Sequence, residues 1–584
     1  MRIIIFTIIA LSCSSVLYAQ TIPHGAHRGV NQVPIGEEVY SYLRHLSVRG
    51  LINNFSEAEL PLSEYDIVVL LGSADTTKLS SSELALHRKF IQTYAREPYD
   101  AVTMFPADNA TPLFFEGIPT EKDKYLYRWK DDSTLSDLQV HGLANLEFRS
   151  RTKPTSGHGE LGLIGGRFTG TISGHVGFFM EATNGQSFGD TTIAAEDASI
   201  AHNKNFSLYS HTFFDNTSGE LSYTYDWFTA KIAREALAFG GSYQGNNILI
   251  SPDIQQPDFV TLAAHVGAVR YQVVVASILG EARFSVPPDS FYNAFGAGAY
   301  IDPKYLTVHD LTFLIGKDLE MGFTDMVIFS RRFDLAYINP FTFLKSVEAS
   351  LNDRDNGLLG AHARWRVADG FELRGEGLVD DVVGSKIGSG FWSNKFAWQI
   401  GGMWAAPLGL RDVDIAFEHT RVEPFTYSHF NSQNTFSTSG QVLGAAIGPN
   451  SMSFWGQIRW TPSEKLTLEA DITLVEHGEN FYDSTGQLKK YYDSSGHVIY
   501  DGNQGGDFEL SVTHPGDVGR SFKILDGNRV NSLTIDATAS YELWRGLNFF
   551  VRGYSKSVDY VSGTPLNPRE KPYGFFGIGA RAIF

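Results

Sequence analysis

The chain has 584 residues, of which 19% are charged and 13% aromatic, and its formal net charge is -18. Together with 57 glycines, this composition excludes a disordered chain, a coiled coil and a protein of long helices, and it favours many strands joined by glycine-containing turns. The negative charge argues against nucleic acid as a partner.

Residues 1–20 have the pattern of a signal peptide that is cleaved on export. Arg2 supplies the positive end, the apolar stretch runs from Ile3 to Leu11, and Ala19 ends the cleavage site. That stretch is too short for a membrane-spanning helix. The one cysteine, Cys13, lies inside this peptide, where a lipoprotein signal is the alternative interpretation. The exported chain would then have no disulfide, thiolate metal site or cysteine nucleophile.

Residues 21–130 are predicted to form a small periplasmic helical domain. Apolar residues at helical spacing indicate one helix starting near Pro34 and ending before Gly50. A second is capped by Ser63 and a third by Ser80, with Glu83 at capping-box spacing. A packed bundle is the simplest interpretation. The stretch 42–65 also resembles one S-layer-homology repeat, a module that binds cell-wall polymers, so peptidoglycan is a candidate partner.

From residue 135 to 584 apolar and polar residues alternate with a period of two. In one segment Leu466 to Leu474 supply the apolar face, and in another Leu533 to Leu543 do so. The strands are long enough to cross a membrane at a tilt, and short turns alternate with long polar loops. Aromatic residues fall near strand ends, among them Trp460, Tyr541 and Trp544. The pattern predicts an all-β transmembrane antiparallel β-barrel with long extracellular loops, exported to the Gram-negative outer membrane and surrounded by its lipid.

The C-terminal segment predicts the closing strand of that barrel. Phe576, Ile578, Ala580, Ala582 and the terminal Phe584 share one face. A final strand that ends in an aromatic residue resembles the recognition signal of outer-membrane barrels. We therefore expect Phe584 to act as the signal for the barrel-assembly machinery.

Three segments, in this order, resemble the capsule-assembly Wzi-like family. The first, 226–247, contains Ala233-Arg234-Glu235 and a Gly- and Asn-rich loop, although Ala238 to Gly241 replaces a common tryptophan-glycine-proline run. The second, 331–341, begins with Arg331-Arg332, and the third, 352–381, begins with Asn352-Asp353-Arg354. The resemblance covers nearly the whole exported chain.

This resemblance implies a barrel of about eighteen strands with the helical domain on its periplasmic side. It also implies a role in holding capsular or related surface polysaccharide at the cell exterior, as a lectin-like protein that is not an enzyme and needs no cofactor. Two other functions stay open from the sequence: an outer-membrane porin or transporter, and a cell-wall tether that uses the helical domain. The sequence does not specify the polysaccharide.

A group of charged residues in these three segments cannot face lipid and is expected in the lumen or at the barrel ends. Its members are Arg234, Glu235, Arg331, Arg332, Asp353, Arg354, Asp355, Glu376, Asp380 and Asp381. The first interpretation is a structural ion-pair network that fills the lumen and holds plug loops. The second is a path that contacts sugars or ions. The chain carries none of the standard serine-hydrolase or zinc-protease motifs, so we assign no catalytic and no metal residues.

One long loop contains a short repeat built on tyrosine and aspartate. Its members are Tyr482, Asp483, Tyr492, Asp493, Tyr500 and Asp501. The surrounding Asp-Ser-Thr-Gly and Asp-Ser-Ser-Gly sequences are turn formers, which predicts a protruding hairpin. Tyrosine rings stack on sugar faces and carboxylates accept hydroxyl hydrogen bonds, so the same residues are candidate polysaccharide contacts.

Overall fold

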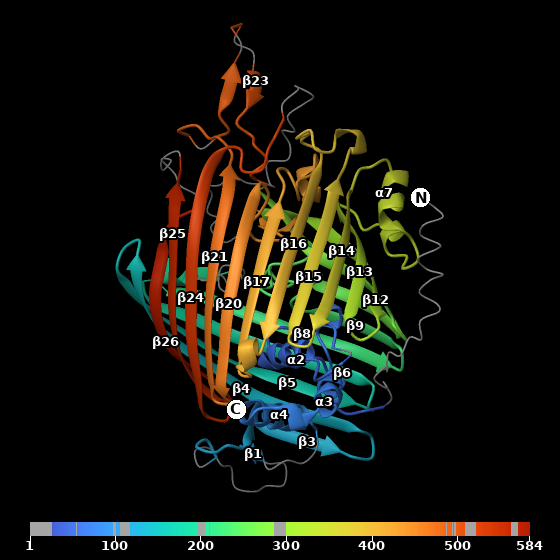
Figure 1. Ribbon diagram of the computed structural model, residues 1–584, viewed down its shortest axis with the longest axis vertical. Helices are drawn as coiled ribbons and strands as arrows, with labels where there is room; N and C mark the ends of the chain where they lie inside the picture. Colours follow the sequence, from blue (N-terminus) through green and yellow to red (C-terminus); the bar gives the residue numbers. More distant parts are fainter. Residues whose placement is uncertain are drawn as a thin grey trace.

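Eighteen antiparallel strands close into a barrel, as the alternating pattern predicted (Figure 1). The computed structural model describes residues 26–53, 55–96, 101–105, 117–190, 192–195, 205–208, 211–284, 299–485, 487–492, 494–495, 498–507, 521–561 and 570–584. The expected signal peptide and Asp493 lie outside these residues. Within the part of the chain so described, no helix combines the length and the apolarity that a membrane crossing needs.

The barrel strands follow one another around the wall in chain order, and β26 pairs with β4 to close it. They are β4 (Ser136–Lys153), β5 (Gly157–Ile172), β6 (Val176–Gly189), β8 (His211–Tyr225), β9 (Phe228–Arg234), β10 (Asp258–Val266), β11 (Val269–Phe284), β12 (Ala299–Ile315), β13 (Leu319–Ser330), β14 (Asn356–Ala368), β15 (Phe371–Asp381), β16 (Lys395–Ala405), β17 (Val413–Val422), β20 (Ser451–Ser463), β21 (Leu466–Glu479), β24 (Asn528–Trp544), β25 (Leu547–Tyr560) and β26 (Tyr573–Ile583).

Shorter strands lie outside this ring. β3 (Tyr127–Asp131) and β7 (Asn205–Leu208) extend the pairing at β4 and β8. The other short pairs are β1 (Ala101–Thr103) with β2 (Asp123–Tyr125), β18 (Ser437–Thr438) with β19 (Gln441–Val442), and β22 (Lys490–Tyr492) with β23 (Val498–Asp501).

The two ends of the barrel differ in their connections. At one end, the short-turn end, strands are joined by 173–175, 226–227, 267–268, 316–318, 369–370, 406–412, 464–465 and 545–546. At the other, the long-loop end, the connections include 190–210, 235–257, 331–355, 423–450 and 480–527. This asymmetry matches the short periplasmic turns and long extracellular loops of outer-membrane barrels, as predicted.

The outer face carries the apolar half of the alternation. On β20 the side chains of Phe454, Ile458 and Trp460 are exposed to the outside, whereas Gln457 and Arg459 line a cavity in the lumen. Trp460 and Tyr541 lie close to the short-turn end, where an interfacial girdle of aromatic residues was predicted. The observed pattern is that of a wall with lipid on one side and polar groups on the other.

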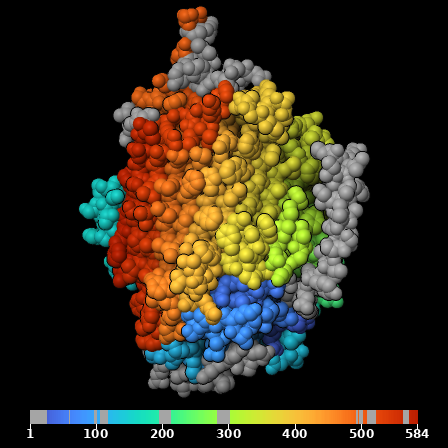
Figure 2. Space-filling model, in the orientation of Figure 1, coloured from blue at the N-terminus to red at the C-terminus, as the bar shows by residue number. Residues whose placement is uncertain are grey.

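Three helices form the helical module, residues 26–96, which fills the mouth at the short-turn end (Figures 1 and 2). They are α2 (Glu38–Val48), α3 (Glu64–Gly72) and α4 (Ser81–Tyr94). Ser63 and Ser80 both make the capping boxes expected of them. The first helix begins at Glu38 instead of Pro34, because Pro34 opens a turn in which its carbonyl accepts the Glu37 N–H.

The module is wedged into the barrel and packs around its own apolar core. His45 Nδ1 lies 2.7 Å from an Asp414 carboxylate oxygen, and Arg366 donates to the Ser47 carbonyl at 2.8 Å. At the turn 369–370 the Gly370 N–H donates to the Val48 carbonyl. The helices therefore close this end of the lumen.

Candidate functional site

Two of the long loops fold back into the lumen and form what we call the plug, residues 235–257 and 423–450. The first loop is pinched by an antiparallel bridge between Phe239 and Ile250. The second turns through the β18–β19 hairpin. The Ser251 N–H donates to the Leu443 carbonyl at 2.8 Å, and the Tyr427 hydroxyl donates to the Ile248 carbonyl at 3.0 Å. These bonds join the two loops into one body.

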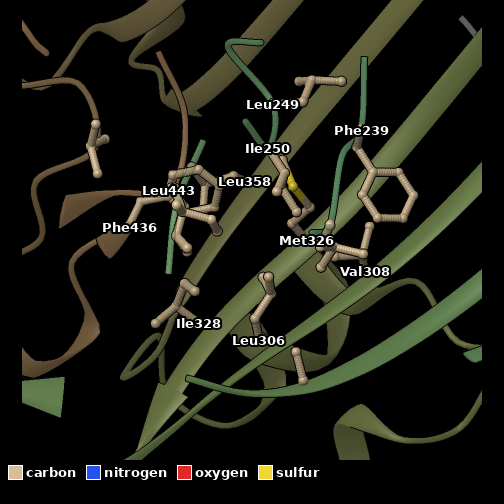
Figure 3. Close-up of a cluster of buried hydrophobic side chains, with 14 of the residues drawn as sticks. Phe239, Leu249, Ile250, Leu306, Val308, Met326, Ile328, Leu358, Phe436 and Leu443 are labelled. Atoms are coloured by element: carbon tan, nitrogen blue, oxygen red, sulfur yellow. The ribbon is translucent and has the colours of Figure 1, made fainter. Parts of the chain in front are cut away.

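The plug packs against one side of the wall through a dry apolar core (Figure 3). Its own contribution is Phe239, Leu249, Ile250, Phe436 and Leu443. Inward side chains of the strands meet them, namely Leu306 and Val308 from β12, Met326 and Ile328 from β13, and Leu358 from β14. Burial of so many apolar side chains supplies most of the free energy that holds the plug.

Two wall carboxylates bind the backbone of the first plug loop. Glu376 on β15 accepts the N–H groups of Gly241 at 2.5 Å and Ile248 at 3.0 Å. Glu418 on β17 accepts the Tyr243 N–H at 2.9 Å and the Ser242 hydroxyl at 2.8 Å. Gly240 has a positive φ of 111°, and a Cβ there would come within 2.5 Å of the Glu376 carboxylate. Only glycine fits this approach.

An ion-pair cluster joins the plug, the wall and the helical module. Arg374 pairs with Glu57 of the module and with Glu372 of its own strand, and its guanidinium lies 4.1 Å from the centroid of the Tyr243 ring. Burial alone would raise the pKa of Glu57, but the guanidiniums of Arg374 and Arg44 outweigh it and lower that pKa to about 2. Glu57 therefore stays charged, as a buried carboxylate must when it anchors two cations.

A polar cavity of about 970 Å³ occupies the opposite side of the lumen. It lies between the helical module, the first plug loop and strands β20, β21, β24 and β25. Carboxylates, cations and aromatic rings line it, among them Arg44, Tyr243, Asp471, Asp536, Tyr554 and Lys556. Asp471 accepts from the Trp455 indole and from Gln457, both at 3.0 Å. This volume and this lining suit a hydrophilic ligand of a few sugar units or ordered water.

The structure places three of the ten predicted charged residues within the lumen. Glu376 binds the first plug loop, and Asp380 accepts the Tyr427 N–H of the second at 2.8 Å. Glu235 pairs with Lys231 at 2.5 Å, and the same ammonium donates to Gln32 of the helical module. All three residues connect the wall to the plug or to the helical module. This arrangement agrees with the first interpretation from the sequence, a structural network that holds plug loops.

Six others lie at the long-loop end. Asp355 is buried and accepts from Arg332 at 3.2 Å, from Arg354 at 3.3 Å and from the Tyr337 hydroxyl at 2.8 Å. Arg331 and Asp353 have positive φ angles in the loop 331–355, and Asp381 is exposed at the end of β15 with Lys395 3.9 Å away. These six residues therefore stabilise the long-loop end, mainly the loop 331–355, and do not line the lumen.

Arg234 differs from the other nine. Lys231 and Ala233 of β9 are buried toward the lumen, so Arg234 points outward, where it is exposed and pairs with Asp258 of β10 at 2.9 Å. It is the last residue of its strand and lies at the long-loop end. Arg234 therefore lies at a barrel end, one of the two positions expected from the sequence, on the outer face of the wall and outside the lumen.

The Tyr–Asp repeat forms a hairpin that projects beyond the strand ends (Figure 1, at β23). Asp483 accepts the Thr485 N–H at 2.8 Å and the Gln487 N–H at 3.2 Å, a turn stabilised by its own side chain, and Tyr482 donates to Asp507 at 3.4 Å. Tyr491 is paired with Tyr500 and Lys490 with Asp501, and the Tyr492 ring is exposed. The turn sequences therefore predicted the hairpin correctly.

Glu376 and Asp380 were predicted, but other residues that hold the plug escaped the sequence analysis. Glu418 and Arg374 stand in ordinary alternating strands, and Glu57 belongs to the stretch 42–65, which was assigned to helix packing or to a likeness to an S-layer-homology repeat. Their partners are far away in the chain. Only the inward position of a charge on an alternating strand could have marked Arg374 and Glu418, and Asp471 and Asp536 share that position.

The chain matches no family model and no curated protein. Among solved structures it resembles Wzi of Escherichia coli, an outer-membrane protein that is involved in group 1 capsule assembly and is a carbohydrate-binding β-barrel. The TM-score is 0.55 at 12% identity, over 94% of this chain and 99% of that one. OprD of Pseudomonas aeruginosa follows with a TM-score of 0.40 and 10% identity, over 77% of this chain and 93% of that one. OccAB2 of Acinetobacter baumannii has a TM-score of 0.42 and 9% identity, over 76% and 98%.

The likeness to Wzi is one of fold, and at this identity it does not show family membership. The chain thus has the fold of an outer-membrane β-barrel, and its likeness to Wzi extends over nearly the full length of both chains.

Proposed function

We propose that this protein binds surface polysaccharide, of the capsular kind, at the cell exterior and does not catalyse a reaction. The observation that carries the proposal is the fold likeness to Wzi, which spans nearly the full length of both chains. The resemblance of three sequence segments to the Wzi-like family supports the same function independently.

The closed lumen supports binding over transport. The helical module fills one mouth, and the plug fills the side of the lumen next to β11–β15. A diffusion porin needs a continuous water-filled path, whereas a binding protein needs only a rigid frame for its loops.

The projecting hairpin is the proposed contact surface, with Tyr482, Tyr492 and Tyr500 as stacking platforms and Asp483, Asp493 and Asp501 as hydroxyl acceptors. The Tyr492 ring is exposed, and the β22–β23 hairpin that carries it projects beyond the strand ends (Figure 1), where a polymer outside the cell would meet it first. Aromatic stacking combined with carboxylate hydrogen bonds is a common way to recognise sugar rings.

Two comparisons test this function. Deleting the gene in an encapsulated strain should increase released polysaccharide and decrease cell-bound polysaccharide by several-fold, and unchanged retention would contradict the proposal. Restoring the gene with Tyr482, Tyr492 and Tyr500 all changed to alanine should fail to recover retention. The control is Tyr541→Ala, an exposed tyrosine at the short-turn end, which should recover it.

The second candidate, a porin or transporter, is favoured by the polar cavity of about 970 Å³. It predicts steady conductance in planar bilayers. The third, a cell-wall tether, places its binding surface on the helical module. It predicts that the full-length protein in detergent is retained on purified peptidoglycan, and that substituting exposed residues of α4 abolishes this retention.

A further inference from the structure

One long loop, 331–355, folds outward instead of inward, and we call it the flap. It leaves β13, passes through η4 (Leu335–Tyr337) and α7 (Leu344–Ser350), and returns to β14. Figure 1 shows α7 outside the sheet beside β13 and β14. Met326 and Ile328 of β13 enter the apolar core of the lumen, so the alternating Val327 and Phe329 point outward. Both are nevertheless fully buried, because the flap covers them.

The flap is fastened to the outer wall by polar groups that would otherwise face lipid. Asp325 of β13 accepts the Leu344 N–H at the start of α7 at 2.5 Å. His309 of β12 lies with its Nδ1 3.2 Å from the Thr342 carbonyl oxygen, and Tyr271 of β11 donates to the Pro340 carbonyl. The flap therefore runs across three neighbouring strands and hydrogen-bonds to one outward polar side chain of each.

The position of the flap along β13 places it at the level of the membrane. Strands rise ~3.3 Å per residue and tilt by roughly 40° in such barrels, so Asp325 lies about 15 Å along the barrel axis from Leu319. Leu319 is paired with Trp365, an exposed aromatic residue near the short-turn end. Since the apolar band of an outer-membrane barrel is about 25 Å tall, the flap covers the half of that band nearer the long loops.

The outer surface of the flap is apolar. The side chains of Phe341 and Leu335 are 91% and 78% exposed, and those of Phe333 and Phe343 are also exposed. They continue the stripe formed on the wall by Met321 and Phe323 of β13. At the beginning of the flap the Arg331 guanidinium is largely exposed, with Asp302 3.9 Å away. The neighbouring Arg332 is also partly exposed and pairs with Asp334 and Asp355, both at 3.2 Å. An apolar face edged by guanidiniums has the charge pattern of a lipid that carries phosphate on its head group.

We propose that the flap is a lipid-binding site on the outer wall. Its apolar side chains enter the acyl chains of the leaflet on the long-loop side, and Arg331 and Arg332 bind the phosphate groups of a phosphorylated membrane lipid. Continuity with the lipid-facing stripe selects a lipid as the occupant. A protein partner could reach the flap only by displacing lipid both from the flap and from its own surface. The proposal depends on the barrel fold and is independent of polysaccharide binding.

Spin labels at single cysteines measure the depth of the flap directly. In a Cys13→Ser background, Phe341→Cys and Leu335→Cys are labelled and the protein is reconstituted into vesicles of phosphatidylethanolamine, phosphatidylglycerol and bisphosphorylated lipid A. Both labels should show the high oxygen and low nickel-complex accessibility of a label at Ile578, which lies on the outer face of β26. The reference for water is a label at Leu408, which is exposed in the turn 406–412 at the short-turn end. Accessibility of the flap labels equal to that of Leu408 would overturn the proposal.

A second measurement tests the phosphate contact. Native mass spectrometry should find bisphosphorylated lipid A retained by the wild type, and the double variant Arg331→Gln, Arg332→Gln should retain at least five-fold less. Arg529→Gln is the matched control, since Arg529 is similarly exposed at the long-loop end of β24 and should leave retention unchanged. Equal retention by the double variant and the wild type would refute the assignment of the phosphate-binding residues.

Discussion

The two sides of this lumen are built from strands with the same alternation and have opposite character. Beside the plug, the inward side chains of β12, β13 and β14 include the apolar Leu306, Val308, Met326, Ile328 and Leu358, and the plug packs on them through its own apolar side chains. Along β20, β21, β24 and β25 the inward side chains are charged or polar and surround a cavity of about 970 Å³. The period of two thus determines which residues face inward, and their chemistry determines whether that part of the lumen is sealed or hydrated.

The largest expected difference between the two sides comes from one buried charge. Ile250→Asp places a carboxylate in the dry core, where an unpaired charge costs on the order of 4 kcal/mol. The plug should be released, which protease cleavage within 235–257 and a new bilayer conductance would both report. Val475→Asp makes a comparable change at the cavity. Val475→Asp should leave the protease cleavage and the conductance as in the wild type. An equal effect of the two variants would show that the plug side and the cavity side of the lumen do not differ in this way.

Acid should loosen the helical module through Glu57. Because the pKa of Glu57 is lowered in the folded protein to about 2, its stabilisation is fully present above about pH 4.5 and is lost as the pH falls toward 2. A shift of this size corresponds to roughly 3 kcal/mol. The module can be crosslinked to the wall by a reagent that forms no disulfide. In the wild type the yield of this crosslink should decrease as the pH is lowered from 6 to 2. In Glu57→Gln it should be weaker at neutral pH and nearly independent of pH.

The dry side owes its shape to features that the sequence only partly reveals. The alternation, the strand lengths and the two serine caps predicted the barrel and the helices, since these depend on local spacing. The run Met326-Val327-Ile328-Phe329 breaks the alternation because the plug covers one face and the flap the other. A continuous apolar run is the mark of a strand buried on both faces. The partners of Glu376 and Arg374 could not be predicted, because backbone N–H groups and distant carboxylates leave no local pattern.

A smaller effect is expected where a wall carboxylate holds the plug backbone. Glu376→Ala leaves the N–H groups of Gly241 and Ile248 without their acceptor, which should cost roughly 2 kcal/mol. Glu469→Ala removes a carboxylate from the cavity side and should change stability by less than about 0.5 kcal/mol. The midpoints of unfolding in urea, measured in the same detergent, compare the two. Equal shifts would show that the carboxylates on both sides hold structure to the same degree.

The smallest effect on stability belongs to the end of the chain. Phe584 bonds Gly142 through its backbone, and its side chain contributes only ~2 kcal/mol of burial at most. We propose that the assembly machinery recognises this terminal aromatic residue, so that deleting it should lower the amount of folded barrel in outer-membrane fractions. The heat-modifiability of the surviving fraction should stay that of the wild type. Normal assembly at equal expression would contradict a signalling role for Phe584.

The most direct test of the central claim, a closed lumen that serves as a frame for polysaccharide binding, is the conductance of the purified wild-type protein in planar bilayers. The plug and the helical module predict membranes that stay at baseline conductance in 1 M salt, while the Ile250→Asp variant produces steady channels in the same preparation. Steady channels from the wild type, with the plug intact by protease resistance, would contradict the account and favour a transporter.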